Sequence, residues 1–175
     1  MLKDGRGTDV TFSVAGELFH AHRCVLAAWS PVFEAELFGP VKEEATQPIR
    51  IDDMEPTIFE ALLHFIYTDS CNAGGNVAMQ HLLVAADRYG LDRLKAICED
   101  KLCHAIDVET VATTLTLAEQ HQCVQLKDGC LRFIASRDVL RDIMMTHGFK
   151  HLVASCPWVI KEILDKMIEV SIIQW

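Results

Sequence analysis

Alternating apolar and polar residues predict a β-hairpin near the start of the chain. Residues 10–14 (VTFSV) place apolar side chains at every second position, which is typical of a half-buried strand. Ala15-Gly16 then offers a two-residue turn into residues 17–21, so we expect these two segments to pair. Ile49 and Ile51 continue the same alternation and predict a third short strand.

Helical spacing of apolar residues takes over in the remainder of the chain. Residues 23–28 predict a short apolar helix. Ser30 is expected to cap the next helix, since Pro31 then falls in the first turn, where a missing N–H costs nothing. Pro56 marks a further helix start, and Tyr89-Gly90 marks a helix end, because glycine commonly follows the last helical turn.

The last third of the chain is predicted to be wholly helical. Asp107 is expected to cap a helix that carries Glu109 in its first turn. The final helix has the most regular apolar stripe, which consists of Ile160, Ile163, Leu164, Met167 and Ile168. A small N-terminal sheet followed by helices indicates an α+β fold class.

Composition and charge exclude several classes of protein. The 175 residues are 50% hydrophobic and 23% charged, which excludes a disordered chain and suffices for a core without metal or disulfide. With 16 basic and 25 acidic residues, the net charge of −9 has the wrong sign for collecting phosphates, so we expect no nucleic-acid partner. Residues 1–70 hold five basic and twelve acidic residues, a net −7 that suits a basic protein partner.

Neither a membrane span nor a disulfide framework is expected. The longest uncharged stretch, residues 70–86, is interrupted by asparagine, glycine, glutamine and histidine, which hydrocarbon would reject. The N-terminal residues predict no signal peptide. The seven cysteines form no CxxC pair, so they are interpreted as free thiols of a reducing compartment, the nucleus or the cytoplasm.

The sequence offers little catalytic or metal-binding chemistry. His20 and His22 form an HxH pair, but a third ligand at sensible spacing is missing, so a structural histidine is favoured over a zinc ligand. Cys103-His104 and Cys123 lie within or beside apolar helical stripes, where core packing is the favoured role of a cysteine. There is no GxSxG, P-loop or GxGxxG motif. We therefore expect no enzyme, no cofactor and no metal site.

Three separated segments resemble one known domain in the correct order. Residues 8–38 carry the pattern D-V-x-F-x-V, a turn, F-x-A-H-R and S-x-x-F, and closely resemble the opening of a BTB/POZ domain. Residues 49–69 (IRIDDMEPTIFEALLHFIYTD) and 81–103 (HLLVAADRYGLDRLKAICEDKLC) continue the resemblance. It implies a BTB/POZ fold over residues 1–106, with a small sheet and a helical cluster.

The remaining residues resemble a more specific group. The segments FGPVKEEA, IDDMEP and FIYTD are similar to plant MATH-BTB proteins, relatives of the speckle-type POZ adaptors. Residues 107–175 look like a partial, all-α BACK-like extension, because 107–135 is similar to the helical pair that follows BTB in cullin-3 adaptors. The resemblance implies a non-enzymatic adaptor of a cullin-3 ubiquitin ligase, which supports ubiquitination and proteasomal degradation of substrates.

The resemblance also assigns candidate cullin-binding residues. Val41 and Glu43 match a loop motif of a hydrophobic residue, any residue and glutamate, although an acidic surface loop is the alternative. Asp87 and Tyr89 match the turn between the two closing helices of the domain, which faces the cullin in the family. Tyr89 is equally compatible with packing of that helix pair.

Val25 and Leu26 match positions that face the partner subunit in BTB dimers. Trp29 stands where relatives usually carry a basic or small polar residue, and we assign it to the same interface because it would enlarge the apolar dimer face. We therefore expect a homodimer, or a hetero-oligomer with other BTB proteins; ordinary core packing is the alternative for the two aliphatic residues, and a local pocket for Trp29. Of the helix that precedes the first strand in relatives, only Leu2 and Lys3 could remain. A MATH segment is missing, and the ending SIIQW differs from family tails.

Two rival functions stay open at this point. One is a self-association or transcription-cofactor module without a ligase role. The other is a truncated competitor that occupies cullin-3 without bringing a substrate, since the substrate-binding MATH domain is absent from these residues.

Overall fold

A three-stranded sheet begins the described chain, with β1 (Val10–Val14) between β2 (Glu17–Ala21) and β3 (Ile49–Ile51). The computed structural model describes residues 7–39, 47–136 and 139–173. β1 is antiparallel to β2 and parallel to β3. The hairpin turn places Ala15 and Gly16 at φ values of 48° and 89°, the left-handed backbone that tight hairpins require. The three predicted strands are confirmed.

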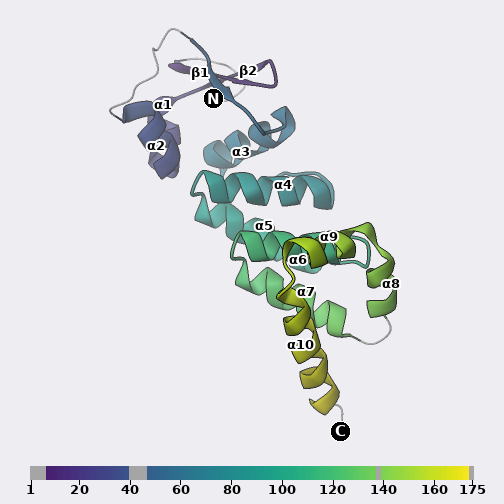
Figure 1. The fold of residues 1–175 in the computed structure, drawn as a ribbon. Coiled ribbons are helices and arrows are strands. Elements are labelled where there is room, and N and C mark those ends of the chain that lie inside the picture. The colour runs from purple at the N-terminus through teal and green to yellow at the C-terminus, as the bar shows by residue number, and fades with distance from the viewer. Residues whose placement is uncertain (1–6, 40–46, 137–138, 174–175) are drawn as a thin grey trace. The chain divides into compact units, whose positions relative to one another are not determined.

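The chain divides into two compact units, residues 1–98 and 99–175, and each is described by itself. The first unit contains the sheet and the helices α1 (Arg23–Trp29), α2 (Pro31–Phe38), α3 (Pro56–Thr68) and α4 (Gly75–Arg88), as Figure 1 shows. A fifth helix, α5 (Asp92–His104), runs across the boundary between the units. α1 contacts both α2 and α3, and α3 packs against α4.

The core of the first unit is built around aromatic rings. Phe12 on β1 is fully buried and contacts the rings of Phe33 and Phe59, with centroids 5.6 and 5.3 Å apart. Phe12 comes from the strand, Phe33 from α2 and Phe59 from α3, so one ring joins all three elements. Burial of such rings supplies much of the hydrophobic stabilisation of a small domain.

Two helix ends in this unit follow the sequence signals closely. The Ser30 hydroxyl accepts a hydrogen bond from the Phe33 backbone N–H at 3.1 Å, which caps α2 as predicted. Gly90 lies just past the end of α4 at a φ of 64°. A Cβ atom there would lie 3.0 Å from Cγ of Pro31, so both the backbone and the neighbouring ring favour glycine.

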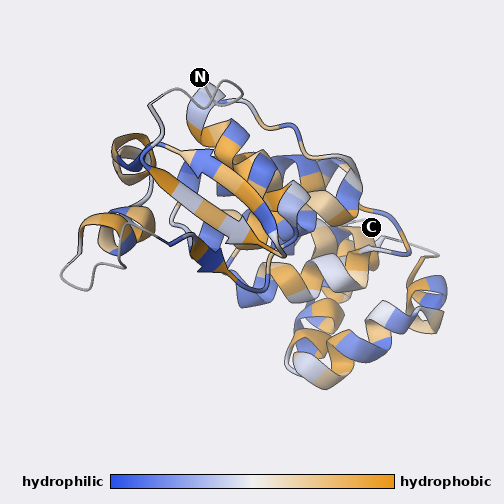
Figure 2. Ribbon diagram, turned by 90° about the horizontal axis from the view of Figure 1, so that it is seen from above, coloured by the Kyte–Doolittle hydropathy of each residue, from blue (hydrophilic) through white to orange (hydrophobic). Residues whose placement is uncertain are grey.

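The second unit consists of five helices in the described residues: α6 (Val111–Gln120), α7 (Val124–Ala135), α8 (Leu140–Met145), α9 (His147–Ser155) and α10 (Val159–Ile173). α6 packs against α7 and α9, and α10 packs against α7 and α9. Hydrophobic residues recur at intervals among hydrophilic ones along the helices of both units (Figure 2). This spacing gives an amphipathic helix one apolar and one polar face. In the part of the chain that the structure describes, no helix has the length and apolar character needed to span a membrane.

Two details of the second unit differ from the sequence expectations. Asp107 does not cap α6, which begins at Val111; its carboxylate instead accepts hydrogen bonds from the N–H and hydroxyl of Thr110 within the preceding turn. The apolar stripe of α10 is also only partly buried. Ile163 is 3% exposed, whereas Leu164 and Ile168 are 55% and 59% exposed.

Candidate functional site

Tyr89, which the sequence left open between a rim and a packing residue, is a core residue in this structure. Its side chain is 2% exposed, and its ring stacks on that of Phe33 with centroids 4.4 Å apart. Burial raises the pKa of the Tyr89 hydroxyl to about 12, and the nearby Glu36 carboxylate adds to the shift. Any role of Tyr89 in binding a partner stays a prediction.

The backbone around Tyr89 is fixed to the start of α2 by one serine. The Ser30 hydroxyl donates a hydrogen bond of 2.6 Å to the Tyr89 carbonyl oxygen while accepting from the Phe33 N–H. Ser30 is fully buried, and both hydrogen bonds are therefore shielded from water. This arrangement holds the turn between α4 and α5 against the N-terminus of α2.

Asp87 lies in the last turn of α4, just before the connection to α5. Its carboxylate forms an ion pair of 2.6 Å with Lys95 Nζ, which comes from the first turns of α5. The Lys95 side chain is 18% exposed and that of Asp87 is 37% exposed. The Asp87 carboxylate is thus partly exposed to solvent at the end of α4, and the buried ring of the next-but-one residue, Tyr89, holds that helix end against the core.

The three residues assigned to a dimer interface lie differently on α1. Leu26 is fully buried in the core of the first unit, which supports the packing alternative for this residue. Val25 is half-buried, and Trp29 is 39% exposed with its ring edge-on to Phe65 at 5.7 Å. An approaching partner can reach the exposed face of Trp29 and the exposed part of Val25. The role of this set in dimerisation stays a prediction.

The loop motif of Val41 and Glu43 lies outside the described residues. The described elements on either side of it are α2, which ends at Phe38, and β3, which begins at Ile49. Phe38 is 52% exposed at the point where the chain leaves α2. The assignment of the motif to cullin binding stays a prediction.

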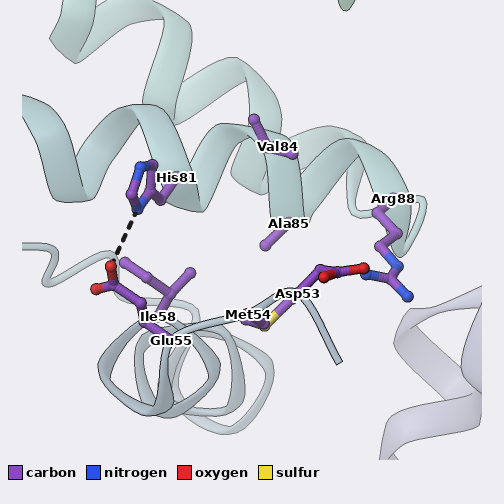
Figure 3. A pocket seen from close by; sticks show the side chains of 8 residues that line it. All are labelled: Asp53, Met54, Glu55, Ile58, His81, Val84, Ala85 and Arg88. Carbon is purple, nitrogen blue, oxygen red and sulfur yellow. Dashed lines mark ion pairs between the residues drawn. The ribbon is translucent and has the colours of Figure 1, made fainter. Parts of the chain in front are cut away.

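One pocket was not identified from the sequence. It has a volume of about 450 Å³ and lies between the segment 53–58, which leads into α3, and the last two turns of α4. Figure 3 shows the Glu55 and His81 side chains at one end and those of Asp53 and Arg88 at the other. Its residues come from two segments about 25 positions apart in sequence, and no local pattern indicates that the segments lie side by side.

A polar network connects three helices of the second unit. Lys127 on α7 forms ion pairs with Glu119 on α6 and Glu162 on α10, at 2.7 and 2.8 Å. The indole N–H of Trp158 donates to Glu119 at 2.8 Å. The hydrogen bonds from Lys127 and Trp158 lower the pKa of Glu119. Burial tends to lower the pKa of Lys127, but its two carboxylate partners outweigh that effect and raise it.

His20 and His22 each lie close to a hydroxyl group of another element. His22 Nδ1 lies 2.8 Å from the Tyr67 hydroxyl, and His20 Nδ1 lies 3.1 Å from Thr11 Oγ1. Within the described ranges, no group of three or more His, Cys, Asp or Glu side chains is arranged to hold a metal ion. All seven cysteines are free thiols, and burial raises the pKa of Cys130 to about 12, with a further contribution from Cys103.

Comparison with known proteins identifies two domain families that match this chain. A family model for the BTB/POZ domain matches residues 1–106, and a family model for the BPM/SPOP BACK domain matches residues 110–164. Among solved structures, the BTB domain of zebrafish PATZ1 has 29% sequence identity and a TM-score of 0.50. That similarity covers 58% of this chain and 80% of the other.

Two curated proteins of Arabidopsis thaliana are similar over nearly the whole chain. BTB/POZ and MATH domain-containing protein 3 is 50% identical over 176 residues, covering 94% of this chain and 43% of that protein. BTB/POZ and MATH domain-containing protein 4 is 42% identical over 179 residues, covering 94% of this chain and 38% of that protein. The chain therefore spans less than half the length of either relative.

Proposed function

The chain belongs to the BTB/POZ family, and from this premise we propose that it is a non-enzymatic adaptor of a cullin-3 ubiquitin ligase. In this role it binds the cullin through its BTB domain and supports ubiquitination of substrates, acting in the nucleus or the cytoplasm. The observation that carries the proposal is the order of two matched domains. A BTB/POZ match over residues 1–106 is followed directly by a BPM/SPOP-type BACK match over residues 110–164.

The proposed docking surface combines a loop with a rigid helix end. Val41 would supply an apolar anchor and Glu43 a hydrogen-bonding carboxylate, a pairing that gives both affinity and orientation at interfaces. Asp87 adds a second carboxylate at the C-terminal end of α4. Tyr89 contributes indirectly in this proposal, because its buried ring and the Ser30 hydrogen bond hold the end of α4 that carries Asp87. The net −7 charge of residues 1–70 favours a basic partner surface.

Self-association belongs to the same proposal. The exposed face of Trp29 and the half-buried Val25 lie on one short helix, where an aromatic side chain gives a partner a large apolar contact. We assign this part of α1 to an interface with a second BTB domain, either in a homodimer or in a hetero-oligomer. Leu26, the third residue of the predicted interface, is fully buried in this chain and supports that helix from within the core.

Isothermal titration calorimetry with the N-terminal region of cullin-3 tests the docking proposal. The double variant Val41→Ala, Glu43→Ala should weaken binding by about 1–3 kcal/mol, since it removes a central anchor and its polar neighbour. Glu60→Ala, Val77→Ala is the matched control. Both control residues are exposed, and Val77 lies about 15 Å along α4 from Asp87.

The outcomes separate the proposed function from its rivals. Equal binding by the wild type and the loop variant would place the docking surface elsewhere on the chain. If the wild type does not bind cullin-3, the chain is better interpreted as a self-association module without a ligase role. A reconstituted ubiquitination assay with a fused substrate then distinguishes an adaptor, which transfers ubiquitin to that substrate, from a chain that only occupies the cullin.

A further inference from the structure

The pocket between α3 and α4 combines an apolar floor with charged ends. Ile58 and Ala85 are 3% and 2% exposed and form the base, and Met54 and Val84 are half-buried at its sides. Its volume of about 450 Å³ falls in the range of small-ligand pockets and accommodates a few side chains of a peptide. All of these residues belong to the first unit.

The two ends differ in their charged groups. Figure 3 shows the Asp53 and Arg88 side chains near each other, so this end carries one carboxylate and one guanidinium. Arg88 Nη1 also lies 3.5 Å from the Asp52 carbonyl oxygen. The Asp52 carboxylate is occupied separately, by an ion pair of 2.7 Å with Arg50 Nε.

Glu55 at the other end keeps most of its hydrogen-bonding capacity for a ligand. Its carboxylate lies 3.9 Å from His81 Nδ1, which is longer than a hydrogen bond. The side chain makes no capping bond to α3, although Glu55 is the N-cap residue of that helix. It is 66% exposed. Asp53, Glu55 and Arg88 give the lining two carboxylates and one guanidinium, an excess of one carboxylate.

We propose that this pocket binds a segment of another protein that presents a lysine or arginine side chain beside an apolar one. The apolar side chain fills the space over Ile58 and Ala85, and the cation pairs with the Glu55 carboxylate. An apolar floor disfavours a bare metal ion or a free sugar, since neither would bury apolar surface there. The excess carboxylate disfavours nucleic acid and anionic lipid surfaces.

This proposal goes beyond docking to a cullin and does not depend on it. The pocket is formed within a single first unit, so its occupancy can be measured on the full chain without cullin-3. A negative result for cullin binding therefore leaves the pocket proposal standing, and the reverse also holds.

Nuclear magnetic resonance titration of the full chain with three tripeptides tests the proposal. The probes are acetyl-Lys-Leu-Leu-amide, acetyl-Glu-Leu-Leu-amide and acetyl-Lys-Ser-Ser-amide. We expect the first to shift the signals of Met54, Ile58 and Val84 saturably, and the other two to bind at least about threefold more weakly, because one lacks the cation and the other the apolar side chains.

A matched pair of variants identifies the carboxylate. Glu55→Gln should weaken binding of the lysine-leucine peptide about threefold and should not weaken binding of the glutamate peptide. Glu60→Gln, at an exposed position of α3 that does not line the pocket, should change neither. The proposal is overturned if the lysine and glutamate peptides bind equally, if shifts map outside the pocket, or if the two variants behave alike.

Discussion

The ring of Tyr89 lies against the ring of Phe33 at a centroid distance of 4.4 Å, with an interplanar angle of 23°. Tyr89 ends α4 and Phe33 lies in the first turn of α2, so the stacked pair joins two segments that are 56 residues apart in sequence. Stacked aromatic pairs contribute about 0.5–1.5 kcal/mol beyond the area they bury. The end of α4, which carries Asp87, is therefore held by the core and not only by its own backbone.

Removing the Ser30 hydroxyl is expected to destabilise the first unit. Ser30→Ala leaves the Phe33 N–H and the Tyr89 carbonyl without this buried partner, at a cost of about 1–3 kcal/mol. Urea unfolding monitored by far-ultraviolet circular dichroism measures the change. Ser70→Ala, at an exposed position, should stay within about 0.5 kcal/mol of the wild type. Equal midpoints for both variants would contradict the buried role of Ser30.

Tyr89 is expected to ionise only in strongly alkaline solution. Its pKa is about 12 in the folded chain, so the folded state keeps a proton that the unfolded state loses near pH 10. The free energy of unfolding should therefore fall as the pH rises from about 10 to 12. Absorbance at 295 nm resolves this step, since the chain has two tyrosines, and Tyr89→Phe leaves only that of Tyr67. Loss of a step near pH 10 in Tyr89→Phe would show instead that Tyr89 is accessible.

The cysteines are expected to differ widely in alkylation rate. Cys24 is exposed, whereas Cys130 is buried and its pKa is raised to about 12. Because the thiolate is the reacting species, iodoacetamide at pH 8 should modify Cys130 more than about 100-fold more slowly than Cys24. Peptide mapping by mass spectrometry measures both rates in one sample. In 6 M urea the two rates should converge, and a slow Cys130 there would indicate a cause other than burial.

Lys127 is expected to stabilise the attachment of α10. Replacing it in Lys127→Met removes ion pairs to Glu119 and Glu162 whose partners are partly exposed, so we expect a loss of about 1 kcal/mol. Amide hydrogen exchange in α10 should become about fivefold faster. Lys161→Met, an exposed change on the same helix, should leave these rates unchanged.

The same network predicts a pH dependence with a defined sign. The pKa of Glu119 is lowered in the folded state, so its contribution is present above the ordinary value of 4.5 and is lost as the pH falls through the lowered value. The protection factors of the α10 amides in the wild type, which are corrected for the intrinsic pH dependence of exchange, should fall over that acidic range. Lys127→Met should show a smaller fall, because Glu119 then loses the partner that lowers its pKa most. An identical pH profile for both proteins would contradict this role.

Features encoded by neighbouring residues were predictable from the sequence. The alternation of residues 10–14 and the turn at Ala15-Gly16 specify the hairpin locally, and Ser30-Pro31 specifies a helix start by its own chemistry. The family resemblance extended the interpretation to the helical second unit. These signals share one property, which is that each depends on residues only a few positions apart.

Features that depend on distant packing were not predictable in the same way. Helical spacing marks Leu164 and Ile168 as part of an apolar stripe, but the structure leaves both exposed because no described element covers that side of α10. The pocket at Glu55 and Arg88 joins residues 33 positions apart, and no local pattern indicates which helix faces which. The packing role of Tyr89 likewise depends on its contact with Phe33, and the sequence alone does not show that these two residues lie together.

The close approach of Gly90 to Pro31 has a consequence for evolution within this family. A side chain at position 90 would meet the proline ring and also force a left-handed backbone on a residue with a Cβ atom. The two positions are therefore expected to covary across homologues, with bulkier residues at 90 tolerated only where 31 is smaller and the turn is rebuilt. An insertion or deletion between α4 and α5 would be selected against for the same reason, so the length of this turn should be among the least variable features of an alignment.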